Sequence, residues 1–248
     1  MRSLTLSVLT LALALPSVPA LAAGDMPVDN SGRKDALIYW GAQFEELEYR
    51  YSDADEELGV WSGDAFYGND TLKLRWLSKG EYAIEDRAWE KLENQLLVQT
   101  PVSDFFDTKA GVRFDTPEGP DRTYAVLGLT GLAPQWFEVD ASLYLSDEGD
   151  TSAEFDAEYE LLITNHLILS AVLDATVAFS EDREIGVGKG LVSTETGLRL
   201  RYDVMGRAFS PYVGVVHERK YGDTADFARA EGGGTEDWFA VIGARIGF

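Results

Sequence analysis

The sequence predicts an all-β fold: a single transmembrane antiparallel β-barrel of about 12 strands, with short periplasmic turns and longer acidic extracellular loops. The stretch from Trp238 to Phe248 supports this most clearly, because every second residue is apolar and the intervening positions include Arg245 and two glycines. A tilted strand needs about 9–11 residues to cross a bilayer, which this stretch supplies. A terminal phenylalanine on such a strand is typical of precursors that the outer-membrane barrel assembly machinery recognises.

The amino terminus provides a second observation, an export signal. An apolar run from Leu4 to Leu15 follows Arg2, and Ala20-Leu21-Ala22 has the small-x-small pattern that signal peptidase cleaves after. The run is too short for a transmembrane helix. We therefore predict a signal peptide at 1–22, a short disordered lead-in at 23–36 and one outer-membrane barrel domain at 37–248.

Charge and cysteine content limit the partners. Without Arg2 the chain has 20 basic and 43 acidic residues, a formal charge of −23, which excludes nucleic acid as an electrostatic partner and favours cations. Cysteine is absent, so an exported chain needs stability from another source than disulfides. A closed, fully hydrogen-bonded barrel supplies it.

Strand patterns continue along the chain. The first is rich in aromatic residues but alternates imperfectly, whereas later ones alternate cleanly, as in Phe137 to Leu145, where Glu138 and Asp140 lie between apolar residues. In order, the predicted strands are 37–51, 58–67, 71–79, 88–99, 106–115, 122–132, 137–145, 153–161, 167–179, 192–202, 208–221 and 238–248. Their number is even, and their short connections make them antiparallel.

The connections provide a third observation, because short turns alternate with longer, more acidic loops. The short turns are 68–70, 100–101, 133–134, 164–166 and 205–207, and the longer loops are 53–57, 80–87, 116–121, 146–150, 181–190 and 222–234. Outer-membrane barrels have short periplasmic turns and longer extracellular loops. The six tryptophans lie near predicted strand ends, where an aromatic girdle at the membrane interface explains them.

Charged residues opposite the apolar face should line the lumen. The candidate metal-ligating residues are Glu138, Asp140, Glu154, Asp156, Glu158, Asp174 and Glu218. One interpretation is a lattice of salt bridges with inward-facing lysines and arginines, and the other is a cation path or binding site. Carboxylate oxygens favour Ca²⁺, Mg²⁺ or Mn²⁺ over Cu(I). Both interpretations remain open at this point.

Neither histidine has an evident catalytic or metal-binding role in the sequence. His217 has the parity of Val213 and Val215, which predicts a lipid-facing position near the outer rim, and His166 lies in a short turn. No G-x-S-x-G, H-E-x-x-H or P-loop motif occurs. We therefore expect a protein that is not an enzyme.

Several long segments resemble one known family. They are Ala110–Asp115 (AGVRFD), Arg122–Leu145, Ala157–Ser170, Ile185–Gly190 (IGVGKG), Gly197–Tyr202 and Ser210–Ala230. In this order they resemble the copper resistance protein B family, outer-membrane proteins associated with bacterial copper resistance determinants. Members often carry an amino-terminal segment rich in Met and His, whereas here Met26 is the only such ligand in the lead-in.

The resemblance implies an outer-membrane barrel involved in copper resistance and copper ion homeostasis, which binds or passes copper ions. It also implies a location in the Gram-negative outer membrane, after export through the cleaved signal peptide. The expected partners are outer-membrane lipid and lipopolysaccharide, the barrel assembly machinery and periplasmic copper-handling proteins, without nucleic acid. The alternative is a porin-like or structural outer-membrane barrel without copper chemistry of its own.

Overall fold

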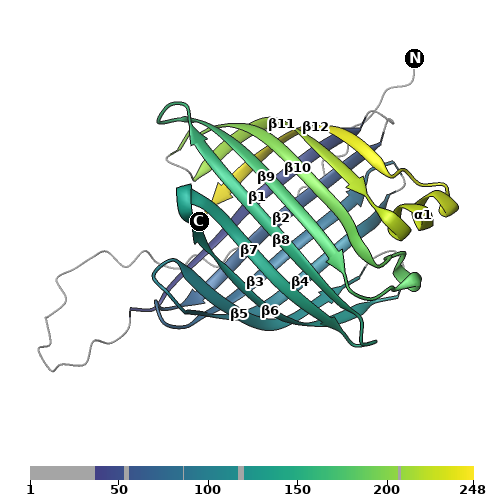
Figure 1. Ribbon diagram of the computed structural model, residues 1–248. Helices are drawn as coiled ribbons and strands as arrows, with labels where there is room; N and C mark the ends of the chain where they lie inside the picture. The colour runs from purple at the N-terminus through teal and green to yellow at the C-terminus, as the bar shows by residue number, and fades with distance from the viewer. Residues whose placement is uncertain (1–36, 53–55, 86, 117–119, 206–207) are drawn as a thin grey trace, which may run out of the picture. The chain divides into compact units, whose positions relative to one another are not determined.

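The computed structural model is a closed β-barrel (Figure 1) and describes residues 37–52, 56–85, 87–116, 120–205 and 208–248. Twelve antiparallel strands pair in sequence order, and the last strand pairs with the first, which confirms the predicted fold. The predicted signal peptide and lead-in lie outside the described residues. Among the residues that are described, no helix has the length and apolar character needed to cross a membrane.

The strands agree with the predicted ones to within a few residues at most ends. They are β1 (Tyr39–Ser52), β2 (Glu57–Gly68), β3 (Lys73–Ala83), β4 (Ala88–Pro101), β5 (Phe106–Asp115), β6 (Arg122–Ala133), β7 (Phe137–Ser146), β8 (Thr151–Leu162), β9 (Leu167–Ala178), β10 (Gly190–Tyr202), β11 (Phe209–Lys220) and β12 (Glu236–Gly247). Between them lie η1 (Pro134–Trp136), η2 (Arg183–Ile185) and α1 (Gly222–Glu231).

The connections differ from the prediction in their lengths and in the presence of a helix. At the end that we call the long-loop end, three of the six are only four residues long, at 53–56, 84–87 and 147–150. The turns 69–72, 102–105 and 163–166 at the opposite, short-turn end have the same length, so only the connections with η2 and α1 are clearly longer. The predicted loop 80–87 was too long because β3 continues to Ala83.

The helix α1 is a second correction, because its segment was predicted as a glycine-rich loop. It begins at Gly222 with Asp223 in its first turn, where an acidic side chain favours the positive end of the helix dipole. It ends at Gly232, whose φ of 87° is the left-handed conformation that glycine adopts without strain at a helix C-terminus. The segment lacks a strong apolar stripe, which explains why periodicity did not reveal it.

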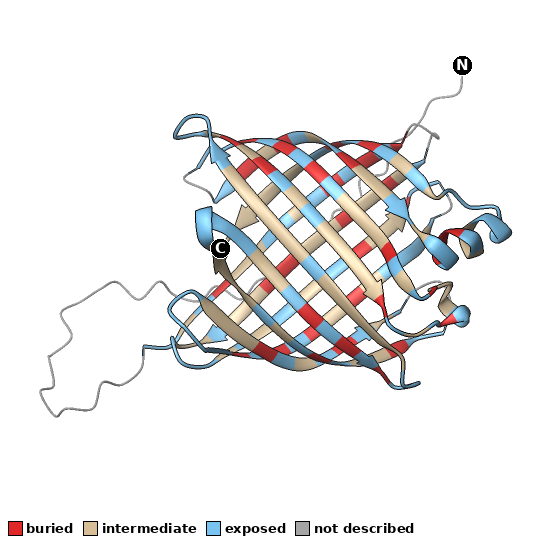
Figure 2. Cartoon of the chain, in the orientation of Figure 1, coloured by how far each residue is buried: buried red, intermediate tan, exposed pale blue. Residues whose placement is uncertain are grey.

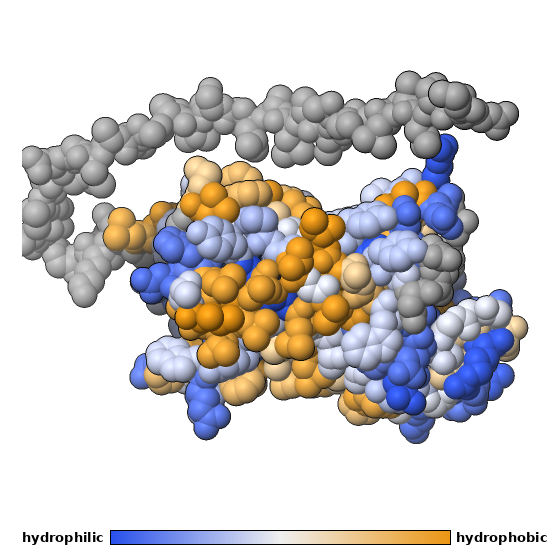
Figure 3. All heavy atoms as spheres, turned by 90° about the horizontal axis from the view of Figure 1, so that it is seen from above, coloured by the Kyte–Doolittle hydropathy of each residue, from blue (hydrophilic) through white to orange (hydrophobic). Residues whose placement is uncertain are grey.

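Side-chain alternation gives the wall two faces. Buried residues recur at alternate positions along the strands (Figure 2), and the positions between them carry the exposed apolar residues. In β12, Trp238 and Ile242 point outward as predicted, with Ile242 59% exposed, and so does Phe248 directly after the strand. Figure 3 shows hydrophobic side chains gathered on the middle of the wall and hydrophilic ones towards its ends. An apolar band flanked by polar ends is the surface that a lipid bilayer covers.

The irregular first strand contains a β-bulge. On β2, Gly63 and Ser62 are consecutive, but their partners on β1 are Phe44 and Glu46, so Glu45 is the extra residue. The pairing of β1 with β12 shifts in the same interval. A bulge makes two successive side chains share a face, and here Glu45 and Glu46 both point into the barrel. This explains the imperfect alternation of β1.

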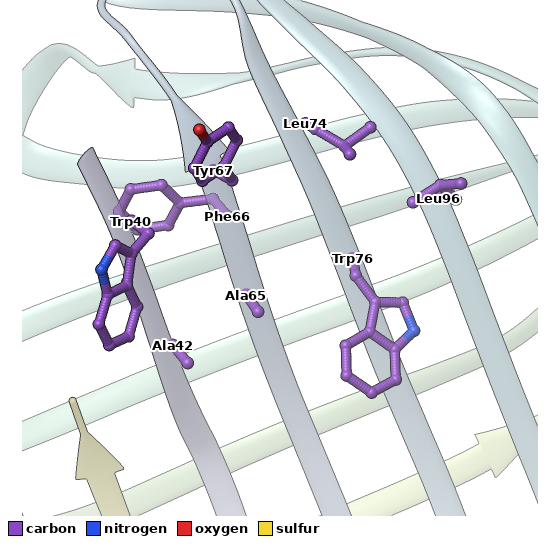
Figure 4. Close-up of a pocket in the computed structure, with 9 residues that line it drawn as sticks. Trp40, Ala42, Ala65, Phe66, Tyr67, Leu74, Trp76 and Leu96 are labelled. Atoms are coloured by element: carbon purple, nitrogen blue, oxygen red, sulfur yellow. The ribbon is translucent and has the colours of Figure 1, made fainter. Parts of the chain in front are cut away.

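Aromatic residues lie at both ends of the outer surface, as the girdle prediction requires. At the short-turn end, Trp40 and Trp76 flank the small side chains of Ala42 and Ala65 in a shallow apolar depression of about 250 Å³ (Figure 4). At the long-loop end, Trp89 stands edge-on to Trp61 at 5.2 Å and to Tyr82 at 4.9 Å. Such amphipathic rings anchor a barrel at the two membrane interfaces.

Candidate functional site

The lumen contains a continuous row of carboxylates on six adjacent strands. Because directly paired residues lie side by side in a sheet, the register aligns inward-facing acids from strand to strand. The row consists of Asp140 on β7, Asp156 on β8, Asp174 on β9, Glu195 on β10, Glu218 on β11 and Asp237 on β12. We call this set the carboxylate row. Four of the seven predicted metal residues belong to it.

The row crosses most of the height of the barrel. Asp140 is the fourth residue of β7 counted from the short-turn end, whereas Asp237 is the second residue of β12 counted from the long-loop end. Barrel strands are tilted, so a line of direct cross-strand neighbours climbs along the barrel axis as it passes around the wall. The row is therefore a diagonal band of negative charge inside the lumen.

Cations from β1 and β5 bind three carboxylates of the row on either side of its centre. Arg50 on β1 donates hydrogen bonds to Glu218 at 2.8 Å and to Glu195 at 3.1 Å, and its side chain is only 2% exposed. Lys109 on β5 contacts both oxygens of Asp140 at 2.6 Å and is equally buried. These pairs are fixed in place, because a buried charge without its partner is costly.

The centre of the row is held differently. Asp156 and Asp174 are direct cross-strand neighbours, so their carboxyl groups lie side by side at the centre of the row. Their cation is Lys79 on β3, whose ammonium lies 3.8 Å from Asp156 Oδ1. The Lys79 side chain is 47% exposed although it points inward, which places solvent-accessible space at mid-barrel.

The three other predicted metal residues lie outside the row. Glu154 faces the lumen but is bound by Arg113 at 2.6 Å and by the Tyr144 hydroxyl at 3.0 Å. Glu138 and Glu158 are cross-strand partners near the short-turn end, and neither forms an ion pair within the described part of the chain. Of these three residues, Glu154 is therefore paired with a cation of the protein, whereas Glu138 and Glu158 are available to a bound cation.

A second group of lumen charges contains two carboxylates that were not predicted. Glu46 and Glu48, which lie after the bulge on β1, bind Arg199 on β10 at 2.7 and 2.6 Å. Glu48 also accepts a hydrogen bond from Arg50 at 2.8 Å, so one buried network joins β1, β10 and β11. The doublet Glu45-Glu46 within an otherwise alternating strand is the sequence signal that could have revealed it.

The lumen is also less polar than expected. Two apolar clusters lie on its inner wall: Leu58, Val60, Ala83, Val216, Phe239 and Val241 form the first, and Leu97, Val126 and Tyr144 with Leu77 and Tyr124 form the second. Phe239 and Val241 have the same parity as Arg245, so the inner face of β12 combines apolar and charged residues. The carboxylate row therefore lies among apolar side chains, which reduce water around it and strengthen its field.

The long-loop end has its own charged contact. Arg122 at the start of β6 donates to Asp182 at 3.0 Å and to Glu184 at 2.8 Å, which ties the connection between β9 and β10 to β6. The Gly188 amide of this connection donates to the Thr224 hydroxyl of α1 at 2.9 Å. The two longest connections are therefore packed against each other and against the rim.

No closed metal site is present in the described ranges: no three His, Cys, Asp or Glu side chains are arranged to hold an ion. His217 lies on the outer face as predicted, 4.5 Å from the Trp238 ring and 3.1 Å from Glu236. His166 is in the turn between β8 and β9, beside the Asp203 carbonyl. Any cation in the lumen would meet mainly carboxylate oxygens.

A twelve-stranded barrel with an apolar outer band and a charged lumen is an outer-membrane type of β-barrel. Among solved structures, the chain is similar to the NanC porin, with a TM-score of 0.51 and 11% identity over 84% of this chain and 99% of that one. At this identity the likeness concerns the fold alone.

The sequence comparisons are more specific. Residues 38–248 match the family described as copper resistance protein B precursor. The chain is 36% identical to copper resistance protein B of Escherichia coli, over 86% of this chain and 71% of that protein. It is also 36% identical to the copper resistance protein B homolog of Pseudomonas syringae pv. tomato, over 82% and 68%. The chain belongs to the copper resistance protein B family, which confirms the resemblance.

Proposed function

We propose that this protein is an outer-membrane barrel of copper resistance that binds or passes copper ions through its lumen. The observation that carries the proposal is the carboxylate row, which leads from the short-turn half of β7 to the long-loop end of β12. Glu138 and Glu158 extend the acidic surface towards the short-turn end. A row of weak sites suits passage, because ions must enter and also leave.

The donor set fits Cu(II) and not Cu(I). Cu(I) selects thioether and thiolate ligands, and the chain has no cysteine and three methionines. Of these, Met205 lies in a turn and 66% of it is exposed, while Met1 and Met26 fall outside the described residues. Carboxylates bind divalent ions with little selectivity, and the Irving–Williams order places Cu(II) above Mn(II) at such ligands.

A porin-like barrel without copper chemistry is the second candidate. The observation that favours it is the extent of pairing in the lumen, where Glu154, Asp140 and Glu218 each contact a lysine or an arginine. A lattice of this kind stabilises a narrow barrel without any transported ion.

We expect the triple substitution Asp140→Asn, Asp156→Asn and Asp174→Asn to weaken binding of Cu(II) and Mn(II) alike, by about tenfold, because it removes the negative charge from the β7 to β9 half of the row. Isothermal titration of the purified protein in detergent measures both affinities, and copper tolerance of a complemented deletion strain measures the function. The matched control neutralises Asp147, Glu148 and Asp150, which change the net charge equally but lie outside the row.

The same titrations separate the candidates. Copper binding that is absent from the wild type and all variants would favour the porin-like barrel. Deleting residues 25–35 should leave Cu(II) affinity unchanged. Tight Cu(I) binding that disappears with this deletion would contradict the carboxylate path and assign copper to a thioether site at Met26.

The proposal includes the location. Residues 1–22 direct export, the barrel resides in the outer membrane in contact with lipid and lipopolysaccharide, and the short-turn end faces the periplasm. There the protein meets periplasmic copper-handling proteins. It acts without catalysis.

Replacing Phe248 by Asp should leave export intact and reduce membrane insertion, because we propose that the barrel assembly machinery reads the terminal aromatic ring. Phe248 is 69% exposed on the outer surface, while its backbone pairs with Ala42, so the substitution removes the ring and keeps the closing hydrogen bond. Heat-modifiable barrel in outer-membrane fractions measures the result. Phe209→Asp is the matched control, an outward phenylalanine at the same end of β11. Equal losses in both variants would show a lipid-contact effect and not recognition of the terminus.

A further inference from the structure

Lys79 reaches across the lumen, which distinguishes it from the other lumen cations. β3 and β8 are five strands apart in a ring of twelve, and the Lys79–Asp156 pair joins them. Among the ion pairs of the described residues, none joins strands that are further apart. The pair of Arg245 on β12 with Glu160 on β8 comes next, at four strands. Lys79 therefore lies in the path of anything that moves through mid-barrel.

Lys79 is also held more loosely than Arg50 and Lys109, the other two cations that bind the row. Arg50 and Lys109 are 2% and 4% exposed and approach their carboxylates to 2.6–3.1 Å, whereas Lys79 is 47% exposed at 3.8 Å. An ammonium on a flexible four-carbon stem can leave such a contact without breaking a fixed hydrogen bond. The centre of the row is thus the position at which a bound cation exchanges most easily.

We propose that Lys79 is a tethered counter-ion that occupies the cation position on the Asp156–Asp174 pair and sets the ion selectivity of the lumen. This inference rests on the proposed function, since it assumes a cation path along the row. An arriving divalent cation displaces the ammonium from Asp156, and the ammonium returns when the cation moves on. Lys79 also weakens the negative field for monovalent cations and gives anions one favourable contact at mid-barrel.

The test is the ion selectivity of purified barrels in planar lipid bilayers, measured as the reversal potential in a potassium chloride gradient. Lys79→Met removes the charge and keeps the length of the side chain. We expect the ratio of K⁺ to Cl⁻ permeability to rise about threefold or more, because the row then acts without its counter-ion. Lys79→Arg, which keeps the charge, should resemble the wild type.

Lys73→Met is the matched control. Lys73 faces inward on the same strand and lies 3.7 Å from Asp107, but it reaches only two strands, to β5, at the short-turn end. We expect its substitution to change the permeability ratio by less than half as much. Asp156→Asn in the Lys79→Met background should reverse most of the gain. A heat-modifiable band for every variant establishes that it is folded.

The outcomes are distinct. An unchanged ratio in Lys79→Met, an equal change in Lys73→Met, or no conductance in any variant would overturn the role of Lys79. Channels that open only in Lys79→Met would also overturn it, because a wild-type lumen that the ammonium blocks has no ion selectivity for Lys79 to set. The copper titrations are an independent measurement. If Lys79 governs the ion selectivity but the barrel does not bind copper, only the copper proposal is contradicted.

Discussion

Replacing Arg50 by methionine is expected to lower the free energy of unfolding by about 3–5 kcal/mol, because removing one partner from a buried ion network leaves uncompensated charge. Arg50 uses all three guanidinium nitrogens: Nε donates to Glu48, Nη1 to Glu218 and Nη2 to Glu195. Glu48 is completely buried and still contacts Arg199, whereas Glu218 is partly exposed and would be left with no cation among the described residues.

Urea unfolding in lipid vesicles, followed by tryptophan fluorescence, measures the Arg50→Met effect. Arg50→Lys should recover only part of the loss, because an ammonium cannot reproduce the three directed contacts of the guanidinium group. The control is Lys91→Met. The Lys91 ammonium is half-exposed and pairs with Glu93, and after the substitution Glu93 still has Arg113 as its partner, at 2.7 Å. We expect Lys91→Met to lower the free energy of unfolding by at most about 1 kcal/mol. Equal losses at Arg50 and Lys91 would show that burial of the network adds nothing.

The sequence was sufficient for the barrel because period-2 alternation is a local property of each strand. In β7 to β9, apolar residues such as Leu143 and Phe155 mark the outer face, and the acids between them mark the lumen. Strand ends were less certain where both faces are polar. In β3, the Lys79-Gly80-Glu81 stretch resembles a loop, yet it pairs with β2 and β4.

The inward direction of the acids was predictable, but their partners were not. Glu154 and Arg113 are 41 residues apart and meet through the lumen, so their contact depends on barrel closure and not on spacing along the chain. The carboxylate row depends on register in the same way. A shift of one residue between β8 and β9 would separate Asp156 from Asp174, and turn geometry sets that register.

Deleting one residue should be tolerated at the bulge of β1 but should prevent folding in a regularly paired strand such as β5. Deletion of Glu45 removes the unpaired residue, so Phe44 and Glu46 then face the consecutive residues Gly63 and Ser62 on β2. On the other side, the four residues left from Phe44 to Glu48 match Ile246 to Gly243 of β12. Every remaining side chain keeps its face, and we expect nearly normal yields of folded barrel.

Deletion of Val112 in β5 should nearly abolish folding, because β5 pairs without irregularity on both sides. Closing that gap turns either Arg113 or Lys109 towards lipid, and a basic side chain at the bilayer midplane costs about 2–4 kcal/mol. It also removes the contacts of that side chain with Glu154 or Asp140. The heat-modifiable fraction after refolding into vesicles compares the two deletions. Equal failure would mean that closure of the barrel requires the bulge, and equal success would mean that register is not fixed by the lumen charges.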